Sequence, residues 1–328
     1  MNATSPPIST PSLKPYRTYN SYLKERFGCR VYKVSIDGGF TCPNRDGVKG
    51  VGGCTFCDET GSSSRSNPAF TPITQQVLKN IDYRKRRFGA EKFIAYFQSF
   101  TNTYDTPQAL KERYDEALAS HDDIVGLAIS TRPDCVTPEI LDLIASYKKQ
   151  VPYVSVEYGL QTIHNRSLEL VNRCETYEEF LQAYAWTRER NINHCVHVIL
   201  GMPSETWADM MATAEALAKL KVEGVKIHML VAMEHTPIAE QYLTGMWQSM
   251  SFETYIATCV DFIERLHPEC IIHRVAGNGH PKHVLFPTWM SHERDDVMTA
   301  IDAEFARRAL GRDLVIRCKS VCVSLMFV

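Results

Sequence analysis

Apolar, strand-like segments recur along this chain at a nearly regular interval, and this rhythm limits the fold more than any other feature. The first spans residues 30–36, and five more follow at Lys92–Phe97, Ile124–Ser130, Tyr153–Tyr158, His194–Leu200 and Val225–Val231. Most begin about 30 to 40 residues apart, which is the length of a strand–helix–strand unit. The segments are almost continuously apolar, as is typical of parallel strands that are buried on both faces.

Helix starts fall between these segments. Thr106-Pro107 and Thr137-Pro138 each place a capping Thr before a Pro at the first helical position. Thr176 and Glu179 form a capping box. Six such units predict an α/β fold in which right-handed crossovers wind the sheet into a partial TIM-like (β/α)6 barrel. Functional groups in that architecture gather at the carboxyl ends of the strands.

Three parts of the chain differ in pattern. Residues 1–15 are rich in Ser, Thr and Pro, and we expect a flexible tail. Residues 16–267 are expected to form the barrel core. Residues 268–328 are expected to form a small α+β C-terminal extension, with a short strand at Ile271–Val275 and a helix over Asp295–Leu310. For the apolar tail 314–328, an edge strand and a poorly ordered segment both stay open.

Composition excludes several classes of protein. The 328 residues carry a net charge of −2 and are 44% hydrophobic, which is ordinary globular material without a global nucleic-acid footprint. No run of 18 apolar residues suggests a membrane span, so we expect no membrane partner. The 11 cysteines are scattered and odd in number, and no signal peptide precedes them. These features predict a reducing, cytoplasmic location.

A cysteine motif follows the first strand directly. Cys42, Cys54 and Cys57 are spaced C-x11-C-x2-C, and glycines in the loop between them allow it to fold back. Soft thiolates in this arrangement suit either zinc or an iron–sulfur cluster. Three thiolates would leave one iron of a cubane cluster open for chemistry. A structural zinc ion would require a fourth ligand, for which Cys29 is the nearest upstream candidate.

Further motifs, in order, resemble one family. The matching stretches are Lys33–Gly47, Gly52–Cys57, Gln98–Tyr104, Thr131–Asp134, Glu157–Thr162 and His197–Pro203. Together they resemble the radical S-adenosylmethionine (SAM) enzymes, and within these the bacterial YhcC/YtqA-type proteins, which are related to the radical-SAM subunit of Elongator. The cysteine spacing is longer than the usual C-x3-C-x2-C, as in this subfamily. The acetyltransferase domain of Elongator has no counterpart in this chain, so its acetyl-CoA chemistry is not implied.

The resemblance implies a specific chemistry. The three cysteines would hold a [4Fe–4S] cluster, and SAM would chelate the fourth iron. A one-electron reductant such as flavodoxin or ferredoxin would drive SAM cleavage to a 5′-deoxyadenosyl radical. The kinship with Elongator points to tRNA as the substrate. The implied reaction shortens the carboxymethylaminomethyl side chain of the wobble uridine to aminomethyl.

Seven residues are the expected SAM contacts by this resemblance: Gln98, Ser99, Arg132, Glu157, Gln161, Arg173 and Gly201. Gln98 and Ser99 would hold the SAM amino group, Arg173 its carboxylate, and Gly201 would pack against adenine. Glu157 stands out because a carboxylate within an apolar strand requires a partner. Ribose hydroxyls or the SAM ammonium would serve, together with Gln161; the alternative for Glu157 is a buried ion pair with Arg132 or Arg173.

Other interpretations stay open at this point. Arg132 could form a salt bridge at the barrel rim with Asp134 instead of contacting SAM. His197, His228 and His235 are candidate proton donors. A second interpretation is a radical SAM enzyme that acts on a small molecule, because Gly159–Gln161 and Asn172-Arg173 resemble a sequence pattern of oxygen-independent coproporphyrinogen oxidase. A third is a non-enzymatic zinc-binding RNA adaptor. If the substrate is tRNA, the basic run 84–87 and Arg307, Arg308 and Arg312 are candidate phosphate contacts.

Overall fold

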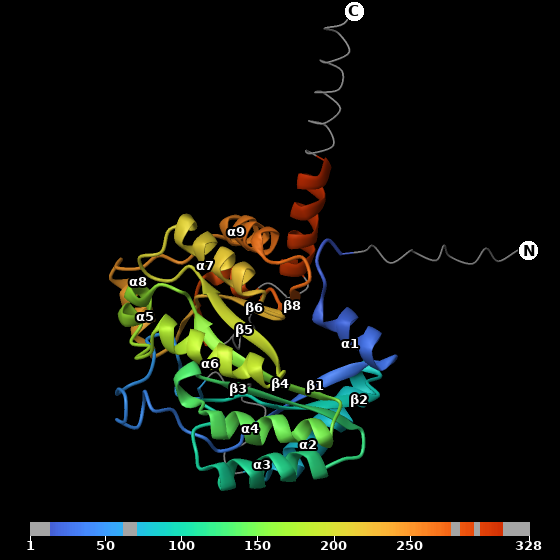
Figure 1. Ribbon diagram of the computed structural model, residues 1–328. Coiled ribbons are helices and arrows are strands. Elements are labelled where there is room, and N and C mark those ends of the chain that lie inside the picture. Colours follow the sequence, from blue (N-terminus) through green and yellow to red (C-terminus); the bar gives the residue numbers. More distant parts are fainter. Residues whose placement is uncertain (1–13, 62–70, 277–282, 292–295, 311–328) are drawn as a thin grey trace, which may run out of the picture.

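The computed structural model describes residues 14–61, 71–276, 283–291 and 296–310. At its centre is a seven-stranded sheet in which every pairing is parallel and the strands follow chain order. The strands are β1 (Val31–Ile36), β2 (Lys92–Phe97), β3 (Ile124–Thr131), β4 (Tyr153–Gln161), β5 (Asn193–Leu200), β6 (Gly224–Met229) and β8 (Ile271–Arg274). The sheet curls into a half-barrel (Figure 1), so the predicted α/β partial barrel is confirmed.

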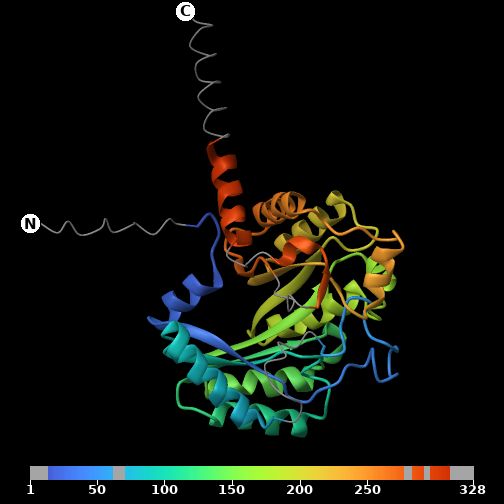
Figure 2. The same ribbon diagram turned by 180° about the vertical axis from the view of Figure 1, so that it is seen from behind.

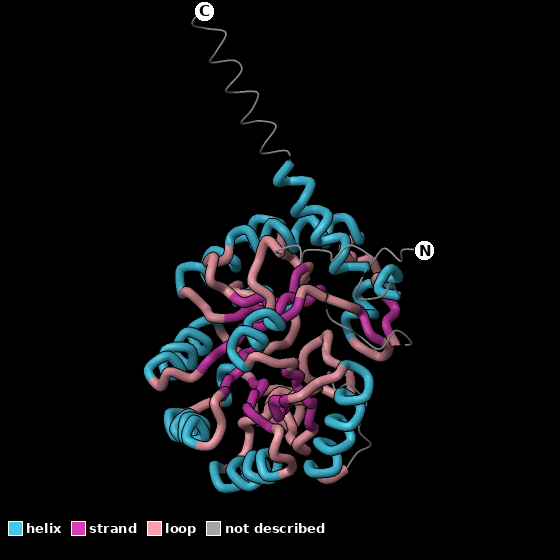
Figure 3. Tube along the Cα trace, turned by 90° about the vertical axis from the view of Figure 1, so that its right-hand side faces the viewer, coloured by secondary structure: helices cyan, strands magenta, loops and turns pink. Residues whose placement is uncertain are grey.

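Helices cover the outer face of the half-barrel, as Figure 3 shows. Six of them follow β1 to β6: α2 (Ile73–Phe88), α3 (Pro107–Ala119), α4 (Pro138–Ser146), α6 (Tyr177–Glu189), α7 (Trp207–Leu220) and α9 (Phe252–Arg265). The predicted caps are confirmed, because Thr106 and Thr137 accept hydrogen bonds from the first turns of α3 and α4, and Thr176 with Glu179 forms the capping box of α6. Two shorter helices, α5 (Asn165–Leu170) and α8 (Pro237–Leu243), lie in connections.

The two faces of the sheet differ in polarity. On β4, Val154, Val156 and Tyr158 belong to the main apolar core, which the strands share with the covering helices. The alternate residues Ser155 and Glu157 are fully buried polar groups. Since successive side chains of a strand point to opposite faces, these polar residues face the interior of the half-barrel. A parallel sheet with a polar inner face is built around an internal site.

The N-terminal helix α1 (Tyr19–Phe27) packs against both β1 and β8. Thr18 forms a parallel bridge with Ile272, and the Ile272 amide donates to the Arg17 carbonyl at 2.8 Å. The ring of Tyr19 stacks on His273, with 3.9 Å between the centroids. The first described element of the chain therefore lies against the last strand of the sheet.

The segment that leads into α1 also contacts residues 296–310, which are helical. Lys14 pairs with Asp302 at 2.7 Å, and Tyr16 packs on Phe305 with 5.6 Å between the ring centroids. Figure 2 shows the blue N-terminal segment beside this red helix. Both ends of the described chain therefore meet on one side of the half-barrel.

A second, two-stranded antiparallel sheet pairs β7 (Ala232–Met233) with β9 (Val284–Phe286). The boundary predicted at residue 268 remains a prediction; β8, which lies just beyond it, pairs with β6 in the main sheet. Most of the predicted N-terminal tail and the whole apolar tail 314–328 lie outside the described residues. Within the described part of the chain, we find no helix with the length and apolar character needed to cross a membrane.

Candidate cofactor site

A cavity of about 310 Å³ lies at the carboxyl ends of the strands. The three predicted metal ligands, Cys42, Cys54 and Cys57, line this cavity. Five of the predicted SAM contacts line it as well: Gln98, Ser99, Arg132, Gln161 and Arg173. The other two predicted SAM contacts, Glu157 and Gly201, do not border the cavity. The fold thus brings segments that are far apart in the sequence to one site, although the role of each residue remains a prediction.

The cysteine loop is folded back on itself by its own backbone. The amides of Arg45 and Asp46 donate to the Cys42 carbonyl at 2.8 and 3.2 Å, and the Cys57 amide donates to the Cys54 carbonyl at 2.9 Å. Gly53, with φ of +80°, occupies the left-handed region that favours glycine, and its amide donates to Asn44 at 2.8 Å. These turns bring the three thiols of the loop to the same cavity.

Residues 171–172, which follow α5, hold this loop in place by hydrogen bonds. The Thr55 amide donates to the Val171 carbonyl at 3.0 Å, and the Asn172 side chain donates to the Gly53 carbonyl at 2.8 Å. In return, the Asn44 side-chain amide donates to the Asn172 carbonyl. The position of the cysteines therefore depends on a segment more than 100 residues away along the chain.

Two cavity thiols have distinct surroundings. The buried Cys54 sulfur lies 3.6 Å from Arg173 Nη1 and 3.7 Å from Asn44 Nδ2, and both nitrogens are hydrogen-bond donors. Burial, with a further contribution from Cys54, raises the pKa of the Cys57 thiol to about 11. Donors aimed at a sulfur stabilise the thiolate that a metal ligand must become.

The two arginines of the cavity are joined by an acid. Arg132 forms a bidentate pair with Asp134, with both N–O distances 2.8 Å, and its Nη2 lies 3.3 Å from Glu175. Arg173 Nε donates to the other Glu175 oxygen at 2.8 Å, and its Nη2 donates to the Gly159 carbonyl at 2.7 Å. Burial raises the pKa of Glu175 to about 7 despite both guanidinium groups. This network holds the arginines rigidly at the cavity wall.

Several groups at the cavity wall have the features of a ligand site. Arg132 Nη1 and Thr101 Oγ1 are buried and have no hydrogen-bond partner among the described residues, a rare state for buried polar atoms. Ser99 and Gln161 have φ of 136° and 74°, which is costly for residues with a Cβ. Gln161 ends β4 and Ser99 lies two residues beyond the end of β2, both at the cavity, and strained backbone of this kind concentrates where ligands bind.

Glu157 has protein partners rather than a place at the cavity. The carboxylate is fully buried and accepts hydrogen bonds from Lys33, Lys226, Tyr96 and His197. The Lys226 Nζ–Oε2 distance is 2.5 Å and the His197 Nε2–Oε2 distance is 2.8 Å. Its ionic partners are thus the lysines of β1 and β6, not Arg132 or Arg173, which the ion-pair alternative had named.

The charges of this inner cluster determine its protonation. Burial by itself raises the pKa of Glu157, but Lys226 and Lys33 outweigh it and hold the pKa well below its usual range. Burial, with Lys226 nearby, lowers the pKa of His197 to about 4. Burial likewise holds the pKa of His228 well below its usual value. Both histidines, which line the cavity, are therefore neutral near pH 7; His235 does not border it.

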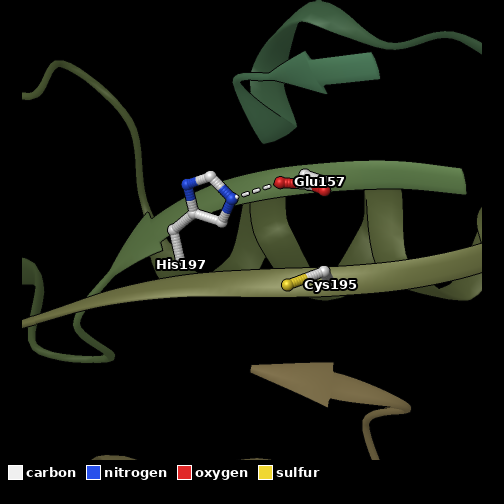
Figure 4. Close-up of side chains that lie close together, drawn as sticks. All are labelled: Glu157, Cys195 and His197. Atoms are coloured by element: carbon white, nitrogen blue, oxygen red, sulfur yellow. Dashed lines mark hydrogen bonds and ion pairs between the residues drawn. The ribbon is translucent and has the colours of Figure 1, made fainter. Parts of the chain in front are cut away.

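Glu157, Cys195 and His197 also offer three metal-binding atoms within 4.8 Å of one another (Figure 4). We do not regard this group as a cation site, because Lys33 and Lys226 already neutralise the carboxylate. Burial also raises the pKa of the Cys195 thiol well above its usual value, so that it stays protonated. Metal binding by thiols requires the thiolate.

Gly201 lies at the end of β5, outside the cavity. Its φ is +83°, its carbonyl accepts a hydrogen bond from Trp247 Nε1 at 3.0 Å, and a Cβ there would meet the Met250 sulfur at 3.0 Å. The glycine therefore allows close packing of Met250, and its predicted contact with adenine remains a prediction.

Sequence reasoning missed several residues of the site. Lys33 and Lys226 carry the same signal that identifies Glu157, because each is a charge within an apolar strand. The sequence offers no comparable signal for Asn44 or Glu175, whose roles depend on contacts between distant segments.

Comparison with known proteins identifies the family. Residues 42–217 match the radical SAM superfamily, and residues 222–307 match the radical SAM C-terminal domain. The chain belongs to the radical SAM superfamily. Members of the superfamily use a [4Fe–4S] cluster and SAM, so the two cofactors that the resemblance implied are confirmed.

Two bacterial relatives match over most of their length. The chain is 40% identical to the uncharacterized protein YtqA of Bacillus subtilis over 297 residues, which are 90% of this chain and 91% of YtqA. It is 34% identical to the protein YhcC of Escherichia coli over 267 residues, which are 81% of this chain and 85% of YhcC. The resemblance to YhcC/YtqA-type proteins is thereby confirmed.

A solved structure and a shorter sequence match are more distant. The fold resembles Elp3 of Methanocaldococcus infernus, with a TM-score of 0.60 at 16% identity over 78% of this chain. The chain spans only 58% of that Elp3 chain. Over 128 residues, 38% of this chain, it is 30% identical to the tRNA uridine(34) acetyltransferase of Methanocaldococcus jannaschii, and the match covers 23% of that protein.

The residues present fit the family's cofactors. Three thiols face one cavity, Arg173 and Asn44 donate toward Cys54, and Arg132 Nη1 has no described partner at the cavity wall. The zinc alternative does not fit, because its fourth ligand, Cys29, lies before β1. That is the opposite end of the strand from the cysteine loop, and Cys29 packs there in a separate apolar cluster.

Proposed function

We propose that this radical SAM enzyme acts on the wobble uridine of tRNA and shortens its carboxymethylaminomethyl side chain to aminomethyl. The observation that carries the enzyme activity is the convergence of three thiols with unpartnered groups of Arg132 and Thr101 in one cavity. The tRNA part is supported by the fold shared with Elp3 and by the stretch similar to a tRNA uridine(34) acetyltransferase.

Each group at the cavity then has a defined task. When bound, the cluster and SAM supply reductive cleavage of the sulfonium, which yields a 5′-deoxyadenosyl radical. Cys42, Cys54 and Cys57 would hold the cluster, and Arg173 donates a hydrogen bond to Cys54. The free N–H of Arg132 is available to an oxygen of SAM. Apolar side chains that also line the cavity limit the entry of water: Phe56, Ile199, Leu230 and Val231.

The predicted basic run does not face the cavity. Residues 84–87 end α2 just before β2, so they lie at the amino ends of the strands, opposite the cavity. Arg86 is paired with Asp82 there. We infer instead that tRNA approaches at the carboxyl ends of the strands, where the cavity lies.

The proposal includes a cytoplasmic, one-electron donor such as flavodoxin or ferredoxin. In the test of the chemistry, anaerobic reconstitution with iron and sulfide should give a brown protein that cleaves SAM when dithionite is added. Replacement of Cys42, Cys54 or Cys57 by Ala should abolish both the colour and the cleavage. A Cys29→Ala variant is the matched control and should retain both.

The test of the substrate compares modified nucleosides in tRNA from cells with and without the gene by mass spectrometry. Loss of the gene should raise carboxymethylaminomethyluridine and lower aminomethyluridine. SAM cleavage by the reconstituted protein, together with an unchanged wobble-uridine profile in cells, would refute the tRNA proposal and favour a small-molecule substrate. A colourless protein that binds zinc alone would refute the enzyme proposal itself.

A further inference from the structure

The deep wall of the cavity is a band of polar side chains on the strands farthest from the cysteine loop. In the sheet register, Gly159 lies beside His197, His197 beside Lys226, and Lys226 beside Arg274. The band therefore crosses β4, β5, β6 and β8 at one level. Four of its side chains line the cavity: His197, Lys226, His228 and Arg274. Tyr96 of β2 also lines the cavity and accepts a hydrogen bond from Lys226.

Together with Lys33 of β1, which reaches Glu157, this wall carries more positive than negative charge. Lys33, Lys226 and Arg274 are cations, and Glu157 is the carboxylate that lies among them. Lys33 and Lys226 both use this carboxylate. The two histidines are neutral near pH 7, as shown above, so they add hydrogen-bonding groups without charge. The cluster as described has an excess of two positive charges, namely three cations less one carboxylate.

Within the described part of the chain, Arg274 is the cation of this cluster without a partner. Its guanidinium forms no hydrogen bond or ion pair with any described residue, although it lines the cavity and is only partly exposed. Lys226, by contrast, donates to both Tyr96 at 3.0 Å and Glu157 at 2.5 Å. A guanidinium presents a planar set of donors that matches an oxyanion in bidentate fashion. An unpaired, partly buried guanidinium is costly unless an anion completes its environment.

We propose that the deep wall is an oxyanion subsite, in which Arg274, with Lys226 and His228 beside it, binds a carboxylate or phosphate group of the substrate. The anion is not assigned to SAM, because the unpartnered Arg132 Nη1 lies near the cysteines, whereas Arg274 lies on the last strand across the sheet. The subsite would place the anionic end of a substrate deep in the cavity. In its carboxylate form, the proposal rests on the tRNA function above.

The test measures binding to the cluster-loaded protein under anaerobic conditions by calorimetry. Three uridine derivatives separate the sources of the anion: 5-carboxymethylaminomethyluridine has a carboxylate, uridine 5′-monophosphate has a phosphate, and 5-aminomethyluridine has neither. We expect one of the two probes that carry an anionic group to bind more tightly than 5-aminomethyluridine, which carries none. Arg274→Gln should weaken that probe about 10- to 100-fold, the range of a charge-assisted hydrogen bond, and Arg274→Lys should restore part of the loss. The exposed Arg87→Gln is the matched control.

A second measurement does not depend on the tRNA function. Crystals grown with selenate should show an anomalous peak within hydrogen-bond distance of Arg274, and the peak should be absent from Arg274→Gln. If none of the three uridine derivatives binds but the selenate peak is present, the subsite stands and the tRNA function fails. If Arg274→Gln binds every probe as the wild type does, or if the selenate peak is missing, the oxyanion subsite is refuted.

Discussion

Replacing Glu157 tests whether the inner cluster is held together by charge. In Glu157→Gln, the ammonium groups of Lys33 and Lys226 lose the carboxylate that both of them contact. The side chains of the three residues are 0%, 16% and 8% exposed, so solvent screens the unpaired cations poorly. Leaving a buried charge without its partner costs about 3–5 kcal/mol, and we expect that loss from the free energy of unfolding.

Removing a lysine should cost less, because Glu157 has two. In Lys226→Met, the carboxylate keeps Lys33 and still accepts from Tyr96 and His197. We expect a loss of about 1–3 kcal/mol, the cost of one charged hydrogen bond. The double variant removes one charge of each sign, so its loss should fall short of the sum by about 1–3 kcal/mol.

The assay is equilibrium urea unfolding of the cluster-free protein at pH 7.5, followed by circular dichroism. Glu139→Gln, an exposed change in the first turn of α4, is the control and should have little effect. Equal losses for Glu157→Gln and Lys226→Met, or strict additivity in the double variant, would refute the charge argument. Unchanged stability of Glu157→Gln with weakened SAM binding would instead favour the direct cofactor contact predicted from the sequence.

Three further predictions follow from other contacts. Burial lowers the pKa of His197 from 6.5 to about 4 in the folded protein, so between these pH values the unfolded chain binds more protons and the folded state loses stability as the pH falls. In urea unfolding, His197→Gln should therefore lose about 1.4 kcal/mol less than the wild type between pH 7.5 and 5.5. A pH profile identical to that of the wild type would contradict this. Arg173→Met removes a cationic donor from Cys54 and should lower the midpoint potential of the reconstituted cluster, by about 59 mV for each tenfold change in the redox equilibrium; a redox titration showing the wild-type value would refute it. Gly126→Ala places a Cβ 2.8 Å from the Tyr153 carbonyl and should destabilise the protein by about 1–3 kcal/mol, whereas an unshifted melting temperature would show that the strands can separate.

The sequence predicts the local features of this fold well. Thr106 and Thr137 cap the helices that they were expected to cap, because a cap depends on residues three positions apart. The strand rhythm likewise follows from burial within each segment. The short strand expected near Ile271 is also present, but its pairing with β6 could not be read from its residues.

Contacts between distant segments account for what could not be predicted. The position of Glu157 within an apolar strand predicts that its carboxylate needs a partner. It does not predict whether that partner is an arginine at the rim of the half-barrel or a lysine in its interior. That choice depends on the register of β1 and β6 against β4, which brings Lys33 and Lys226 to the same level. In the same way, Asn44 and Asn172 gain their role only once α5 has placed the segment after it beside the cysteine loop.

The pairing of the N-terminal segment with β8 has a consequence for synthesis of the protein. Arg17 and Thr18 leave the ribosome early, but their partner Ile272 lies in the last strand of the main sheet to be made. At about 5–20 residues per second, this delay is on the order of tens of seconds. During that time, α1 has only β1 to pack against, and the half-barrel cannot close on its final strand. Nascent chains stalled before residue 271 should therefore be much more sensitive to protease in α1 than chains released after it.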